Sequence, residues 1–197
     1  IAIVGTGSPE TVQIAAERGY AYSSVFVPIV AQEKTFQKLR EEMPKYGHEF
    51  TPDKAIFNAI CYVAETDEIA ERECKEHVRF FFEDATRTTA RYLAPPGYIS
   101  TEQLRMRAAA TASHGGFDWE ALTQQWRVVF GTPDKVANTL GKWCESANSS
   151  RVLVHHHIGD MPHWKVVKNL TLFAEEVIPR LRTRKKAAPA PAMQGAK

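Results

Sequence analysis

Apolar runs alternate along the chain with segments in which apolar residues recur at intervals of three and four. Continuous apolar runs are typical of strands covered on both faces of a parallel sheet. Apolar positions at helical spacing predict amphipathic helices. We therefore predict strands at residues 1–4, 22–27, 55–63 and 152–156, helices at residues 8–19, 31–46, 66–85 and 163–182, and a further helix that starts at residue 132. Pro179 should bend the last helix near its end.

The order of these elements predicts an α/β fold. Strands that alternate with helices form parallel sheets. Four such units suit an open sheet or the last four units of a (β/α)₈ TIM-barrel type fold, which typically needs about 250 residues. Residues 95–130 contain few periodic signals, so we expect an irregular insertion before the final helix-strand-helix. An aromatic-rich segment of this length is often a lid or binding loop, or an insertion packed on the barrel rim.

The turn after the first strand is a candidate anion site. Gly5-Thr6-Gly7 is followed by Ser8-Pro9-Glu10, which is a strong helix start, and Thr11 adds a second hydroxyl to the first turn. Helix N-termini favour negative charge. Alternatively, Ser8 only caps the helix, and the carboxylate of Glu10 already interacts with the positive end of the helix dipole. Residues 131–136 repeat the pattern without a glycine-rich turn, and we interpret them as a plain helix cap.

Three consecutive histidines, His155, His156 and His157, end the last predicted strand. Neighbouring side chains on a strand point to opposite faces, so only His155 and His157 share one. With Asp160 they would offer three metal ligands. Hydrogen bonding to a ligand at the carboxyl end of the strand, or a purely structural role, fits the pattern better than a metal site.

Composition indicates a globular protein, with 44% hydrophobic and 24% charged residues. From Arg180 onward there are six basic residues and no acidic one, which leaves 19 of the 25 basic and all 23 acidic residues on the rest. The body is thus mildly acidic and shows no basic face for nucleic acid. We expect residues 1–182 to form the folded domain and residues 183–197, basic and rich in Ala and Pro, to form a disordered tail.

The three cysteines, an odd number at wide spacing, indicate a reducing compartment, and we expect a cytoplasmic protein. No apolar run reaches the ~18 residues of a membrane span. The chain starts without Met and already within a predicted strand. We therefore expect it to be the back part of a longer chain.

Five motifs together resemble the bacterial luciferase-like flavin monooxygenase family. They are GTGSPET at residues 5–11, AAERG at 15–19, GTPDKV at 131–136, GDMPH at 159–163 and LFAEEVIP at 172–179. The resemblance covers nearly the whole chain up to residue 181. It implies that this chain supplies the last four strands and helices of a (β/α)₈ barrel.

The resemblance also implies a cofactor site. The flavin phosphate would lie at Gly7, Ser8 and Thr11, and Phe26, next to Val25, would lie close to the flavin ring. The cofactor would be reduced FMN, or the deazaflavin F420 in sister groups. The family's catalytic residues fall in the first half of the barrel, so no catalytic residue is assigned here, and we expect this segment alone to be inactive.

The implied reaction is insertion of one oxygen of O₂ into a small organic substrate, with a flavin reductase as a possible electron source. The alternatives are F420-dependent hydride transfer, a metal-dependent barrel hydrolase using His155, His157 and Asp160, and a non-catalytic half-barrel module. A half barrel leaves two open sheet edges. We therefore expect a homo-oligomer.

Overall fold

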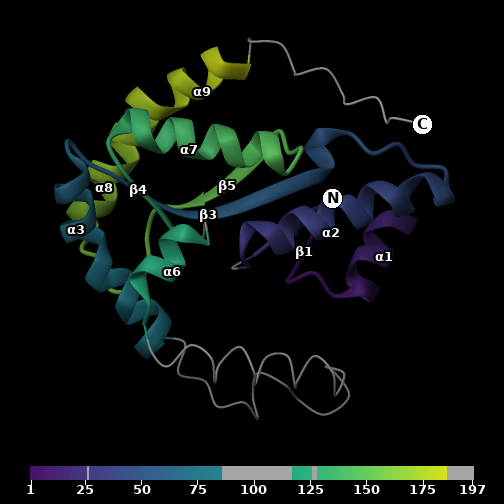
Figure 1. Ribbon diagram of the computed structural model, residues 1–197, viewed down its shortest axis with the longest axis horizontal. Coiled ribbons are helices and arrows are strands. Elements are labelled where there is room, and N and C mark those ends of the chain that lie inside the picture. The colour runs from purple at the N-terminus through teal and green to yellow at the C-terminus, as the bar shows by residue number, and fades with distance from the viewer. Residues whose placement is uncertain (26, 86–116, 126–127, 186–197) are drawn as a thin grey trace.

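The structure is a computed structural model that describes residues 1–25, 27–85, 117–125 and 128–185. Its centre is a sheet of five parallel strands (Figure 1). The strands are β1 (Ala2–Gly5), β2 (Ala21–Ser24), β3 (Ala55–Val63), β4 (Val128–Gly131) and β5 (Arg151–His155). The predicted α/β class with a parallel sheet is thus confirmed.

β3 lies at the middle of this sheet because it pairs along both of its edges. Ile56 pairs with Ser23 of β2 and with Arg151 of β5, whereas Ile60 pairs with Val128 of β4 and with His155 of β5. β2 and β4 therefore share one edge of β3, and β5 occupies the other. The principal run of neighbouring strands is β1-β2-β3-β5, and β4 extends the ladder at the carboxyl end of β3.

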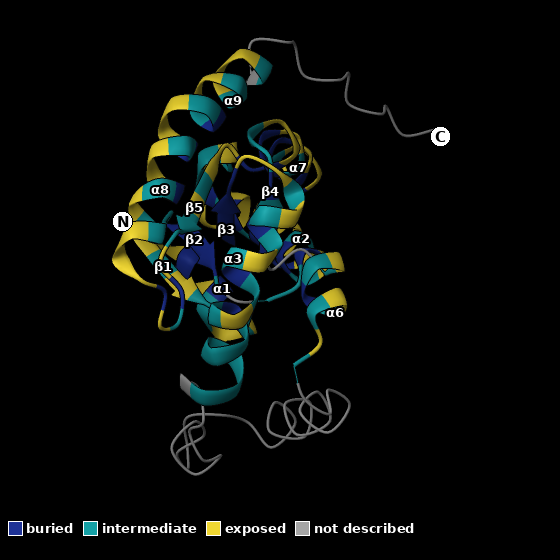
Figure 2. Ribbon diagram, turned by 90° about the vertical axis from the view of Figure 1, so that its left-hand side faces the viewer, coloured by how far each residue is buried: buried dark blue, intermediate teal, exposed yellow. Residues whose placement is uncertain are grey.

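Helices cover both faces of β3. The larger core packs α1 (Pro9–Glu17), α2 (Ile29–Glu42), α7 (Pro133–Ser146) and the end of the last helix against Phe57, Ala59 and Cys61. The smaller core packs α3 (Asp67–Phe80) and α6 (Trp119–Gln124) against Ile60 and Tyr62 on the opposite face. Figure 2 shows β2 and β3 as the buried centre, while β1 and β5 carry exposed residues.

Short helical turns lie next to several helices and strands. They are Met43–Tyr46 after α2, Pro52–Lys54 before β3 and Phe81–Ala85 after α3. The last helix comprises α8 (His163–Leu172), a wide π-helical turn (Phe173–Val177) and α9 (Ile178–Lys185). Pro179 cannot donate a backbone hydrogen bond to the preceding turn, and the wide turn ends two residues before it. Every helix in the described ranges is too short or too polar to span a bilayer.

The segment predicted as irregular is partly regular, and that prediction was wrong for α6 and β4. Asp118 caps α6 through the amide of Ala121, and β4 is only four residues long. Trp119 packs on Phe130 with ring centroids 5.0 Å apart. Trp126 and residues 86–116 lie outside the described residues. β2 ends at Ser24 rather than near residue 27, and α9 continues to Lys185, three residues into the predicted tail.

Asn169 connects the last helix to the sheet. Its side chain is fully buried, and its Oδ1 accepts from the amide of Val63 at 2.9 Å. Its Nδ2 donates to the carbonyl of Cys61 at 2.8 Å and of His156 at 3.3 Å. One side chain thereby satisfies backbone groups at the carboxyl ends of β3 and β5, where the ladder between them has ended.

We predict that Asn169→Ala lowers the free energy of unfolding by roughly 2–5 kcal/mol, because each buried backbone group left without a partner costs about 1–3 kcal/mol. Asn138→Ala is the matched control, since Asn138 is exposed on α7 and its side chain accepts from Arg184. Urea denaturation of both variants measures the difference. Equal losses would contradict the role assigned to Asn169.

Candidate functional site

The turn between β1 and α1 presents two hydroxyls at a helix N-terminus. The Ser8 side chain caps α1 by accepting from the amide of Thr11 at 3.4 Å, and its Oγ lies 2.7 Å from Thr11 Oγ1. Pro9 occupies the first position of the helix, and Glu10 lies in the first turn. The amide of Glu10 has no acceptor within the helix. Among the described residues, this end of α1 therefore combines two hydroxyl groups with a backbone donor that the helix itself leaves unpaired.

A buried tyrosine on the neighbouring strand β2 forms a hydrogen bond with this turn. The amide of Gly7 donates to the Tyr22 hydroxyl at 2.8 Å. Tyr22 is fully buried, and burial raises the pKa of its hydroxyl, an effect that the Gly7 N–H only partly opposes. The hydroxyl thus keeps its own proton as a donor at neutral pH. Sequence pattern does not reveal this contact, because Tyr22 and Gly7 meet only after the two strands pair.

The glycines allow the close approach of that hydroxyl. Gly7 has a φ of +94°, and a Cβ there would lie 2.8 Å from Thr35 Oγ1. A Cβ on Gly5 would meet the Tyr22 hydroxyl itself. Ser24 pairs with Gly5 on the neighbouring strand, and its hydroxyl is buried without a hydrogen-bond partner among the described residues. Such an orphaned polar atom beside the turn is consistent with a site that takes a polar ligand.

The structure brings Ser8 and Thr11 together, with Gly7 directly before them. The Gly7 amide is already used by Tyr22, so the donors that remain for an anion are the two hydroxyls and the Glu10 amide. The carboxylate of Glu10 opposes an anion in the same turn. Phe26 lies outside the described residues. The assignment of Gly7, Ser8, Thr11 and Phe26 to a cofactor stays a prediction.

The N-terminus of α7 has the same sequence pattern but is already occupied. Thr132 caps this helix through the amide of Lys135. The Asp67 carboxylate accepts from the amide of Thr132 at 2.9 Å and forms an ion pair with Lys135. Among the described residues, no carboxylate binds the cap of α1 in this way. The carboxylate of Asp67 thus already fills the place of an anion at the start of α7. The described residues supply no such partner at the start of α1.

The histidines at the end of β5 have separate environments. His155 Nε2 lies 3.4 Å from Asn58 Oδ1, whereas His156 packs edge-on against Phe173 on the other side. Asp160 bonds to His77 of α3 at 2.6 Å. Within the described ranges, no three histidine, cysteine or acidic side chains are grouped as metal ligands. The arrangement gives no support to the hydrolase alternative based on His155, His157 and Asp160.

A polar row crosses the sheet on the face of β3 that Asn58 occupies. Asn58 Nδ2 donates to Ser23 Oγ at 2.8 Å, and Asn58 Oδ1 lies next to His155. Sequence reasoning did not single out Asn58, although a lone amide inside an otherwise apolar run was the available signal. The backbone amide of Asn58 donates to Gln32 Oε1 of α2 at 3.4 Å. This contact lies beyond the last residue pair between β2 and β3.

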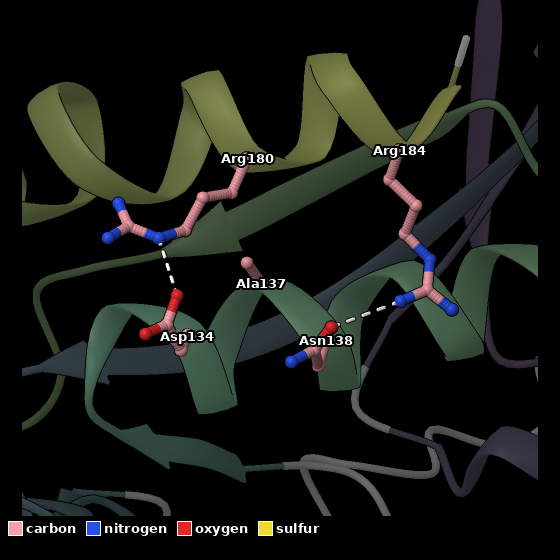
Figure 3. A pocket seen from close by; sticks show the side chains of 5 residues that line it. All are labelled: Asp134, Ala137, Asn138, Arg180 and Arg184. Carbon is pink, nitrogen blue, oxygen red and sulfur yellow. Dashed lines mark hydrogen bonds and ion pairs between the residues drawn. The ribbon is translucent and has the colours of Figure 1, made fainter. Parts of the chain in front are cut away.

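A hollow between α7 and α9 is lined by Asp134, Ala137, Asn138, Arg180 and Arg184 (Figure 3). Both arginines are already paired. Arg180 binds Asp134 and Glu176, and Arg184 binds Glu145 and Asn138. The hollow therefore offers little free positive charge to an anionic ligand.

Comparison with protein families matches residues 2–148 to the luciferase-like monooxygenases. The chain belongs to this family. The resemblance to this family is thus confirmed, and the matched residues include the β1–α1 turn and three of the five motifs. No curated protein matches this luciferase-like chain.

Solved structures show the same fold. They include the monooxygenase RslO1 from Streptomyces bottropensis (TM-score 0.63, 18% identity), which aligns with 91% of this chain and 47% of its own. The oxygenating constituent of 3,6-diketocamphane monooxygenase from Pseudomonas putida, solved with FMN, has a TM-score of 0.61 at 23% identity over 90% of this chain and 47% of its own. The F420-dependent tetrahydromethanopterin reductase of Methanopyrus kandleri has a TM-score of 0.57 at 18% identity over 91% of this chain and 50% of its own.

This luciferase-like chain spans about half the length of those solved relatives. Together with the parallel pairing of β1 with β2, β2 with β3 and β3 with β5, this agrees with the predicted partial TIM barrel. The β1–α1 turn lies at the carboxyl end of its strand, where barrels of this type bind their ligands.

Gly7→Ala should destabilise the fold more than Gly47→Ala. Both glycines have positive φ, which costs a residue with a Cβ about 1–2 kcal/mol. Only at Gly7 would the Cβ also collide, since nothing lies within 4 Å of a Cβ at Gly47. Thermal denaturation of the two variants tests the packing of the turn. A smaller loss for Gly7→Ala would show that the turn is looser than described.

Acid should destabilise the fold through the histidines of β5. Burial lowers the pKa of His155 and of the adjacent His156, so the unfolded chain binds more protons near pH 6. The stabilisation is complete above the unfolded value of about 6.5 and is lost as pH falls through the lower folded values. Unfolding free energies at pH 7.5 and 5.5 measure the loss, which the double variant His155→Gln/His156→Gln should reduce. An unchanged pH dependence in that variant would contradict this assignment.

Proposed function

We propose that this chain forms part of a flavin-dependent oxidoreductase and that its β1–α1 turn binds the cofactor's phosphate. The observation that carries the proposal is the pair of hydroxyls, Ser8 and Thr11, at an N-terminus that no other protein carboxylate occupies among the described residues. Charge-assisted hydrogen bonds to phosphate and the positive end of the helix both favour an anion there.

The residues present fit a phosphoryl group. Ser8 and Thr11 can exchange their mutual hydrogen bond for bonds to phosphate oxygens, and the Glu10 amide supplies a further donor. The Tyr22 hydroxyl, which already accepts from Gly7, holds the turn in its glycine-dependent shape. Reduced FMN bound there would supply the O₂ activation needed to insert one oxygen atom into a small organic substrate. The chain's own part is to bind and orient that group.

The proposal also covers the identity of the cofactor and the source of electrons. FMN is favoured because a relative with this fold was solved in complex with it. F420-dependent hydride transfer is the second candidate, because the reductase of Methanopyrus kandleri shares the fold. A monooxygenase would need O₂ and a source of electrons such as a flavin reductase, whereas the F420 route needs no oxygen. Equilibrium titrations of the chain with FMN and with F420 distinguish the two, because only the true cofactor should bind tightly.

Ser8→Ala should weaken FMN binding by roughly 1–3 kcal/mol, as expected when a hydrogen bond to a charged group is lost. Thr132→Ala removes the equivalent cap of α7, whose N-terminus holds Asp67, and should leave FMN affinity unchanged. Flavin fluorescence titration measures both, at a temperature where circular dichroism shows each variant folded. Equal affinities for Ser8→Ala and the parent chain would refute the phosphate assignment.

A further inference from the structure

Two buried hydroxyls on one side of β2 have incomplete sets of partners. Tyr22 and Ser24 are two residues apart on this strand, so their side chains point to the same face of the sheet. Both residues are fully buried, and the Ser24 hydroxyl has no hydrogen-bond partner among the described residues. The Tyr22 hydroxyl accepts from the amide of Gly7 at 2.8 Å, but its own proton has no acceptor within the described ranges.

The two hydroxyls lie close together beside the backbone of Gly5. Ser24 is the register partner of Gly5 on the neighbouring strand β1. A Cβ on Gly5 would meet the Tyr22 hydroxyl, so this hydroxyl occupies the space next to Gly5 on the face that Ser24 shares. Neighbouring strands lie about 4.8 Å apart. A small movement of the Tyr22 hydroxyl away from β1 would therefore bring it within hydrogen-bond distance of Ser24.

The unmatched groups are complementary. Buried polar groups without a partner are uncommon in folded proteins, and each one calls for an explanation. Burial raises the pKa of the Tyr22 hydroxyl, so it keeps the proton that it would donate. The oxygen of Ser24 can accept that proton. The hydrogen bond from Gly7 is the contact that keeps the Tyr22 hydroxyl on the β1 side.

The Gly7 amide belongs to the turn that carries the candidate phosphate site. It directly precedes Ser8, whose hydroxyl lies 2.7 Å from that of Thr11. Backbone amides at a helix N-terminus are favoured donors to phosphate. A charged phosphate oxygen accepts a stronger hydrogen bond than a neutral phenol does. An anion at this turn thus competes with Tyr22 for the Gly7 amide, and the glycine backbone can adjust without a clash of its own Cβ.

We propose that phosphate binding transfers the Gly7 amide from the Tyr22 hydroxyl to a phosphate oxygen, and that Ser24 then accepts from Tyr22. This exchange rests on the proposed function of the turn. One hydrogen bond breaks and two form, because Gly7 gains the phosphate while Tyr22 gains Ser24. Ser24 is therefore a positioning residue that acts through Tyr22 and does not touch the ligand. The ligand class is a phosphate monoester such as FMN.

Ser24→Ala tests the exchange first. It removes a hydrogen bond that forms only with ligand, so it should raise the dissociation constants for FMN and for inorganic phosphate roughly three- to tenfold. It should not lower the free energy of unfolding of the ligand-free chain, because the hydroxyl that it removes has no partner among the described residues. Unchanged affinities for both ligands would overturn the proposal.

Ser23→Ala is the matched control, because Ser23 is the adjacent buried serine and faces the other side of the sheet. Its hydroxyl accepts from Asn58 Nδ2 at 2.8 Å. This variant should show the opposite pattern, with a lower free energy of unfolding and an unchanged affinity for inorganic phosphate. Equal losses of phosphate affinity in the two serine variants would overturn a specific role for Ser24.

A double-mutant cycle with Tyr22→Phe tests whether Ser24 acts through the tyrosine. Without the Tyr22 hydroxyl, Ser24 has no proton to accept, so Ser24→Ala should leave the dissociation constants unchanged in the Tyr22→Phe background. The same loss in both backgrounds would overturn the exchange. Circular dichroism shows whether Tyr22→Phe folds, and the amide resonance of Gly7 in the parent chain carries the test if it does not.

That resonance reports the exchange directly. Titration with inorganic phosphate should move the Gly7 amide proton downfield, with the same midpoint as the shifts of Ser8 and Thr11, because its new hydrogen bond is charge-assisted. If Ser8 and Thr11 respond but Gly7 does not, the exchange is wrong and the phosphate site stands. If none of the three responds, the proposed phosphate site is wrong and the exchange falls with it.

Discussion

The pairing of β3 along both edges is the constraint on which the rest of the structure depends. β2 and β4 use one edge and β5 uses the other, so a nine-residue strand sets the direction of all its neighbours. Parallel direction places the carboxyl ends of the strands together. Asn169 then satisfies the backbone groups left where β3 and β5 separate. The last helix is thereby fixed to the sheet by hydrogen bonds as well as by apolar packing.

The same arrangement distinguishes the start of α1 from the start of α7. Two helices begin with a hydroxyl cap and proline, but Asp67 occupies the start of α7, whereas α1 begins over the Tyr22 hydroxyl and a glycine-rich turn. Membership of the luciferase-like family and the position of this turn at a strand's carboxyl end agree with a cofactor role for α1. The polar row through Asn58 lies on the face that a complete barrel would enclose.

Local signals predicted much of this fold. The long apolar run of β3 and the Ser8 and Thr132 caps are readable from neighbouring residues, and the structure confirms each. The sequence pattern did not predict β4, because a strand of four residues next to aromatic side chains is too short to show an alternation of apolar and polar positions. β2 ends at Ser24, and the amide of Asn58 donates to Gln32 of α2 instead of to a strand partner. The contacts of Tyr22, Asn58 and Asn169 join residues far apart in sequence, and pattern alone does not reveal them.

The central claim, a flavin phosphate on the first turn of α1, is tested most directly by amide chemical shifts of the isotope-labelled chain. The account predicts that FMN and inorganic phosphate both shift the resonances of Ser8, Glu10 and Thr11, and that riboflavin, which lacks the phosphate, leaves them in place. If FMN instead shifts resonances elsewhere, for example around Arg180 and Arg184, and leaves the turn unchanged, the claim is contradicted.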